Sequence, residues 1–99
     1  MLVHSVFFWL RDDIDDVKRQ AFREGLESLR GVPVVREMYV GVPADSPARP
    51  VLVTDYDFAL TVIMEDMTAH DVYQSHPLHL EFLREFSGCW NRVQIYDAL

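Results

Sequence analysis

The chain has 99 residues, a length at which we expect one domain covering residues 1–99. Nine basic residues stand against 16 acidic ones, so the net charge is −7. Nucleic acids and anionic membranes are bound through clusters of Lys and Arg, and the sequence has none, so we expect neither as a partner. Hydrophobic residues make up 49% of the chain, enough for a core with apolar surface left for another partner.

The first segment, residues 3–10, is rich in β-branched and aromatic residues and predicts a strand. Its apolar side chains fall on both faces: Val3, Phe7 and Trp9 on one, Val6, Phe8 and Leu10 on the other. Such a strand is covered on both sides.

The same segment lacks the basic start of a signal peptide, and no apolar run approaches the ~20 residues of a membrane span. The single cysteine, Cys89, cannot form an internal disulfide. It also follows the expected end of a helix, where a thiol is not activated. We therefore expect a cytoplasmic protein with an inert thiol.

A helix is expected next, starting in the acidic stretch 12–16, whose carboxylates favour the positive end of the helix dipole. Apolar residues then recur at helical spacing: Ile14, Val17, Ala21, Phe22, Leu26 and Leu29. Gly31 and Pro33 end this helix.

Residues 34–42 and 55–64 predict the second and third strands. The connection between them contains Pro43, Pro47 and Pro50, which cannot donate to a strand ladder. It is long for a hairpin, so it is either a plain surface loop or a functional lid or dimer arm.

Two short helices separated by a proline follow. Thr68 and Asp71 have the spacing of a capping box, and the first helix should end near Ser75, before Pro77. Pro77 suits the first position of the second helix, residues 77–86. Gly88 ends that helix, and residues 90–96 predict the last strand.

The order β-α-β-β-α-β predicts an α+β, ferredoxin-like sandwich with a four-stranded antiparallel sheet and helices on one face. The other face carries too much apolar surface to remain in water. Because two-fold dimers are the commonest oligomers, we expect a homodimer joined through its sheet faces, a dimeric α/β barrel.

Three residues could carry acid–base chemistry. His79 lies on the apolar stripe of its helix with Phe82, Leu83 and Phe86, and imidazole titrates near neutral pH. A Tyr73 hydroxyl could donate to a carbonyl oxygen, and His4 lies on the strand face of Val6 and Phe8. The alternative is that both histidines are core residues satisfied by backbone carbonyls and that Tyr73 only packs.

The remaining histidines have simpler expected roles. His76, just before Pro77, should cap the helix end, and His70 should face solvent. His4, His76 and His79 together could form a three-ligand metal set. Because no carboxylate or cysteine is obviously placed to join them, we predict neither a metal nor a cofactor.

Three segments, Val3–Phe8, Tyr73–His79 and Val93–Asp97, resemble the stress-responsive A/B barrel (Dabb) family over essentially the whole chain. The resemblance implies a dimeric α+β barrel; many members have no assigned activity. The olivetolic-acid-cyclase branch of plant polyketide cyclases uses a histidine and a tyrosine that match His79 and Tyr73, and a strand histidine that matches His4. A second pocket tyrosine of that branch falls on Leu26, so the same substrate is not implied.

These observations favour a homodimer that binds a small apolar or carbonyl ligand between sheet and helices. The pocket residues that we predict around His4, Tyr73 and His79 are Val6, Phe8, His76, Phe82, Leu83 and Phe86. One alternative is a cofactor-free cyclase, isomerase or lyase with His79 as general acid or base. The other is a structural dimer without a ligand.

Overall fold

The computed structural model describes residues 1–99 and contains one antiparallel sheet in the order β2-β3-β1-β4. The strands are β1 (Leu2–Leu10), β2 (Glu37–Gly41), β3 (Phe58–Met64) and β4 (Trp90–Ala98). The helices are α1 (Asp16–Ser28), α2 (Met67–Ser75) and α3 (Pro77–Phe86), with short 3-10 turns η1 (Leu29–Gly31) and η2 (Ser87–Cys89). The predicted ferredoxin-like α+β fold is confirmed.

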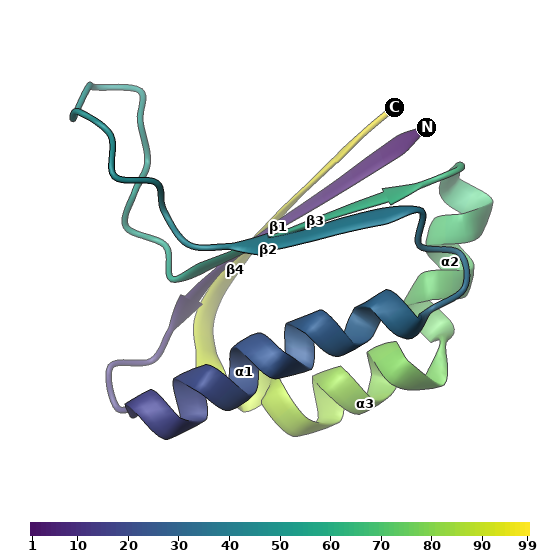
Figure 1. The fold of residues 1–99 in the computed structure, drawn as a ribbon, viewed down its shortest axis with the longest axis horizontal. Coiled ribbons are helices and arrows are strands. Elements are labelled where there is room, and N and C mark those ends of the chain that lie inside the picture. Colours follow the sequence, from purple (N-terminus) through teal and green to yellow (C-terminus); the bar gives the residue numbers. More distant parts are fainter.

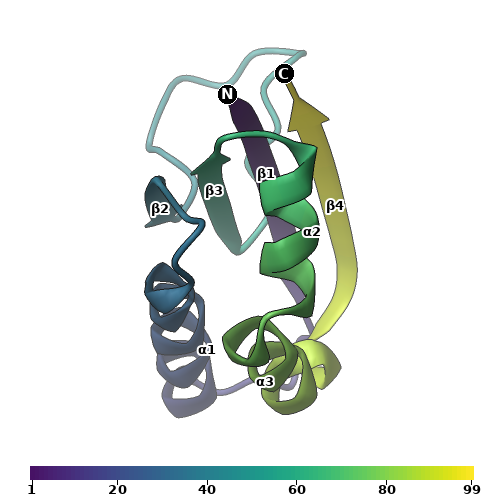
Figure 2. The same ribbon diagram turned by 90° about the vertical axis from the view of Figure 1, so that its right-hand side faces the viewer.

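All three helices lie on one side of the sheet (Figure 1), and Figure 2 shows α1 and α3 side by side with α2 in front of β1. Along β1 the side chains alternate between the helix face, where they are buried, and the outer face, where they are half-buried. β3 alternates in the same way. The core therefore lies between the sheet and the helices, and five phenylalanine rings pack together within it: Phe8, Phe22, Phe58, Phe82 and Phe86.

The outer face of the sheet has no helix over it and carries large apolar side chains. Phe7 contacts Tyr56 and Tyr96 edge to face, and the Arg92 guanidinium lies 4.1 Å from the ring centre of Trp9. The long loop between β2 and β3 rises on this side, away from the helices (Figure 1). The loop therefore cannot form a lid over the helix side of its own subunit. Its position does suit an arm that reaches a second subunit at the outer face of the sheet.

The second and third strands, β2 and β3, are both shorter than the sequence predicts. β2 begins at Glu37 rather than at residue 34, because Val35 N–H donates to the Val32 carbonyl in a turn (3.0 Å). β3 begins at Phe58 rather than at residue 55. The preceding Asp57 carboxylate accepts a hydrogen bond from Leu10 N–H (2.7 Å), so that it closes the loop instead of extending the ladder.

The helix starts also differ in detail. Asp66 caps α2 by accepting from Ala69 N–H at 2.9 Å, so the predicted capping box of Thr68 and Asp71 is wrong. Val17, predicted to be on the buried stripe of α1, is 81% exposed. None of the three helices combines the length and apolar composition needed to cross a membrane.

Helices α1 and α3 approach closely at Gly25. A methyl group at this position would overlap the ring of Phe86, which is buried in the core. The backbone of Gly25 has no positive φ, so the requirement for glycine is one of space and not of conformation.

We predict that Gly25→Ala lowers the free energy of unfolding by about 1–3 kcal/mol, because overpacking exceeds the ~1 kcal/mol that alanine gains in a helix. Urea unfolding measures this change. Gly88→Ala is the matched control, since open space surrounds that position. Adding Phe86→Leu to Gly25→Ala should recover part of the loss; a stabilised single variant would contradict the packing described.

Candidate functional site

A cavity of about 340 Å³ lies between the sheet and helices α2 and α3. Ten of its 13 lining residues are hydrophobic. Leu83 of α3 and Val93 and Ile95 of β4 are each at least 36% exposed, so the cavity meets solvent between α3 and β4. The complete lining is His4, Val6, Phe8, Leu29, Leu60, Tyr73, Gln74, His79, Phe82, Leu83, Trp90, Val93 and Ile95.

The structure brings together the three residues with predicted chemical roles. The ring of Tyr73 lies 4.8 Å from that of His79 and 5.8 Å from that of His4, measured between centroids. His4 and Tyr73 are almost fully buried, and His79 is half-buried. β1, α2 and α3 each supply one of these side chains. All three line the same cavity, so the two imidazoles lie on the same side of the sheet.

Four of the six predicted pocket residues line the cavity: Val6, Phe8, Phe82 and Leu83. His76 and Phe86 lie outside its lining. The His76 Nδ1 atom accepts from Leu78 N–H at 3.1 Å and so caps α3. Phe86 is placed one helical turn beyond Phe82, where its ring packs against Phe22 of α1.

His79 is held as a neutral base. Its Nδ1 atom is buried and has no hydrogen-bond partner. Burial lowers the pKa of His79 below its ordinary 6.5, and the positive charge that His4 can carry acts in the same direction. The nearby Gln74 backbone carbonyl opposes this shift. At neutral pH the imidazole is therefore uncharged and can accept a proton.

Tyr73 is suited to the complementary role of hydrogen-bond donor. Burial raises its pKa well above the ordinary value of 10. The phenol therefore keeps its proton at neutral pH, beside a neutral imidazole that has one ring nitrogen free to accept a proton. A carbonyl oxygen bound between them would face a donor, and an acidic C–H or O–H group would face a base.

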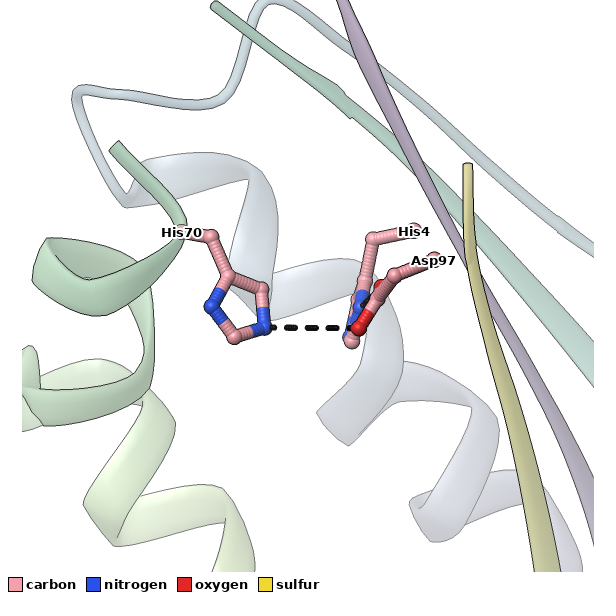
Figure 3. Close-up of side chains that lie close together, drawn as sticks. All are labelled: His4, His70 and Asp97. Carbon is pink, nitrogen blue, oxygen red and sulfur yellow. Dashed lines mark hydrogen bonds and ion pairs between the residues drawn. The ribbon is translucent and has the colours of Figure 1, made fainter. Parts of the chain in front are cut away.

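Asp97 is a site residue that the sequence analysis missed. It pairs with His4 across β1 and β4, and its Oδ1 atom lies 2.5 Å from His4 Nδ1 (Figure 3). The expectation that no carboxylate stands near the histidines is therefore wrong. The available signal was the antiparallel pairing of the first and last strands, which sets residues near the two chain ends opposite each other.

His70 also differs from its prediction. Its side chain is only 12% exposed, and its ring centre lies 5.1 Å from that of His4. His70 Nε2 is 3.9 Å from Asp97 Oδ2 (Figure 3). The reason is helical spacing: His70 lies one turn before the buried Tyr73, on the face of α2 that meets the sheet. The alternative metal set of His4, His76 and His79 does not form, since His76 caps α3.

Comparison with protein families gives one match. The description of that family is Stress Responsive A/B Barrel Domain, Dabb, and its model covers residues 2–98. Among curated protein sequences, none is similar enough to this chain to count as a match.

Several solved structures share the fold. A hydroxynitrile lyase from Passiflora edulis has a TM-score of 0.83 at 16% identity, covering 98% of this chain and 90% of that one. A dimeric ferredoxin-like protein of unknown function from Thermobifida fusca has 0.80 at 17%, covering 98% and 88%. A Dabb family protein from Mesorhizobium loti has 0.79 at 21%, covering 99% and 94%. At these identities the likeness establishes the fold alone.

The lowered pKa of His79 makes stability depend on pH. The unfolded chain takes up a proton at this residue near pH 6.5 while the folded chain does not. The stability that comes from keeping His79 neutral is therefore fully present above pH 6.5. It is lost as the pH falls from 6.5 through the lower pKa of the folded state.

We predict that the melting temperature of wild type falls between about pH 7 and pH 5 more steeply than that of His79→Gln. The other histidines that affect or contact this residue, His4 and His70, remain in both proteins, so the difference isolates His79. Parallel pH profiles would show that His79 is not held neutral.

Proposed function

The chain belongs to the stress-responsive A/B barrel (Dabb) family, and from that premise we propose that it binds a small, mainly apolar carbonyl compound in the cavity between sheet and helices. The observation that carries this proposal is the buried His79 Nδ1 atom, unpaired beside Tyr73 in a largely hydrophobic cavity. Leaving a buried polar atom unpaired costs about 1–3 kcal/mol, so a ligand that satisfies it gains affinity.

The size of the cavity supports a ligand about as large as a single substituted ring. Small-molecule pockets span about 300–1,000 Å³, and this cavity, at about 340 Å³, is near the lower limit. Phe8, Phe82 and Trp90 would contact the apolar part of the ligand. Tyr73 would donate a hydrogen bond to the carbonyl oxygen of the ligand. His79 would face the C–H or O–H group next to that carbonyl.

We also propose a homodimer joined through the outer sheet faces. The half-buried Phe7 and Trp9 support it, together with Tyr96, which is 61% exposed in the single chain. Val51 and Val53 of the long loop extend the same apolar surface. The Thermobifida fusca neighbour is described as dimeric. A cytoplasmic location, supported by the free and buried Cys89, completes the proposal.

A cofactor-free lyase, isomerase or cyclase is the second candidate, favoured by the neutral imidazole of His79. In cyanohydrin cleavage His79 would take the hydroxyl proton as the carbonyl forms and cyanide leaves with the C–C bond electrons. The Passiflora edulis neighbour, named as a hydroxynitrile lyase, shares this fold. Polyketide cyclisation is less favoured, because the second pocket tyrosine of the cyclase branch falls on Leu26. This leucine is fully buried and outside the cavity lining. A structural dimer without a ligand is the remaining alternative.

Acetophenone is a suitable binding probe because it is small, mainly apolar and carries one carbonyl group. We predict saturable binding by calorimetry, with Tyr73→Phe weaker by about 5–10-fold through the loss of one hydrogen bond. His79→Gln should weaken binding by a similar factor. His76→Asn is the control, since asparagine can still cap α3 and His76 lies outside the cavity.

Equal affinities in all four proteins, or no binding to wild type, would leave the structural dimer as the better description. Mandelonitrile then separates binding from catalysis. Cleavage by wild type that falls by about 10²–10⁴-fold in His79→Gln, with cooperative melting retained, would establish the lyase candidate. Binding without cleavage of this cyanohydrin would favour the binding protein.

For the dimer, we predict a sedimenting species of twice the 11.5 kDa chain mass. Phe7→Glu should raise its dissociation constant at least about 100-fold, because an unpaired charge would be buried between the sheets. Val17→Glu, on the exposed face of α1, should leave the dimer intact. A wild-type monomer at micromolar concentration would contradict this interface.

A further inference from the structure

We propose that His4, His70 and Asp97 form a binding site for one divalent transition-metal ion of the zinc class. The three residues come from β1, α2 and β4 and converge at one place beneath the helical layer (Figure 3). One ligand atom from each lies within 4.8 Å of the other two. This site does not depend on the proposed ligand-binding function, although His4 takes part in both.

The chemistry of the donor set selects the class of ion. Two imidazoles and one carboxylate suit Zn²⁺, Co²⁺, Ni²⁺ or Fe²⁺. Ca²⁺ and Mg²⁺ require six or more ligands, mostly oxygen, and this cluster offers a single carboxylate. Three protein ligands would leave a coordination position open, as in catalytic rather than structural zinc sites.

The distances between the donor atoms can reach those of a metal site by side-chain rotation. His4 Nδ1 lies 2.5 Å from Asp97 Oδ1, and His70 Nε2 lies 3.9 Å from Asp97 Oδ2. Ligand atoms bound tetrahedrally to zinc at about 2.0–2.1 Å are roughly 3.3 Å apart. The first distance must open, and the second must close, by less than about 1 Å. The three donor atoms lie within 4.8 Å of one another, so the remaining pair, the two imidazole nitrogens, must close by at most about 1.5 Å. Asp97 lies on an edge strand and its side chain is 33% exposed, so it has room to turn.

An independent observation concerns the other nitrogen of His70. Its Nδ1 atom lies 3.2 Å from Asp71 Oδ1, a contact in which the ring nitrogen donates and the carboxylate accepts. In neutral His70 this leaves a lone pair on Nε2, which faces the Asp97 carboxylate. Two acceptors that face each other need a proton or a cation between them. Carboxylate, histidine and metal in this order are the usual arrangement around metal-bound histidines.

The position of the site relates it to the cavity. His4 belongs to both the cluster and the cavity lining, so an ion held by this set would lie at the cavity wall. His76 and His79 are not members of the cluster.

The test uses tag-free protein comprising residues 1–99, treated with EDTA and titrated with Co²⁺ alone. We expect the visible absorption of low-coordinate Co²⁺ to saturate at one ion per subunit and to disappear when Zn²⁺ is added. Asp71→Asn should weaken Co²⁺ binding about tenfold, because it removes the carboxylate that hydrogen-bonds the metal ligand His70. His70→Gln and Asp97→Asn each remove a ligand and should weaken it by more than about 100-fold.

His76→Asn is the matched control and should bind Co²⁺ as wild type does. Circular dichroism verifies that each variant is folded. Because His70 and Asp97 are replaced separately, the test can be decided with either variant if only one of them folds. Absence of saturable Co²⁺ absorption in wild type, or equal affinity in a folded His70→Gln or Asp97→Asn, would overturn the proposal. His79→Gln should bind acetophenone about 5–10-fold more weakly but keep the Co²⁺ site, so that failure of either function can be recognised separately.

Discussion

The alternation of β1 at the centre of the sheet is the constraint on which the site depends. Because β1 has a strand on each side and helices over one face, every second residue from Leu2 to Leu10 must be buried under those helices. His4 occupies one of these positions and is 3% exposed. A buried imidazole needs polar partners, and Asp97, opposite it on β4, provides one.

The break between α2 and α3 arranges the remaining polar groups. Pro77 ends the first helix and starts the second, with His76 capping the new start. Tyr73 therefore comes from the end of one helix and His79 from the start of the next, and their rings meet 4.8 Å apart. A continuous helix would carry residues six positions apart on different faces. Pro77 does not line the cavity, but the helix break that it causes positions Tyr73 and His79 next to each other.

Much of the fold and part of the site follow from local sequence patterns. The element order and the shared face of His4, Val6 and Phe8 follow from short-range periodicity, and the helix break follows from the backbone geometry of Pro77. Asp97 was missed because its role depends on the register between the first and last strands, which no local pattern reveals. His70 was misplaced because the short α2 exposes two apolar residues, Met67 and Val72, so its hydrophobic pattern does not indicate the buried face.

Replacement of His79 by leucine tests most directly whether this cavity is a binding site or an imperfect core. An imidazole kept for function, with Nδ1 unpaired, should be replaceable by an apolar side chain of similar size at no cost in stability. We therefore predict that His79→Leu unfolds at an equal or higher urea concentration than wild type and loses acetophenone affinity. A loss of about 2 kcal/mol or more in the free energy of unfolding, with ligand affinity unchanged, would show that His79 serves the core and would contradict the proposed site.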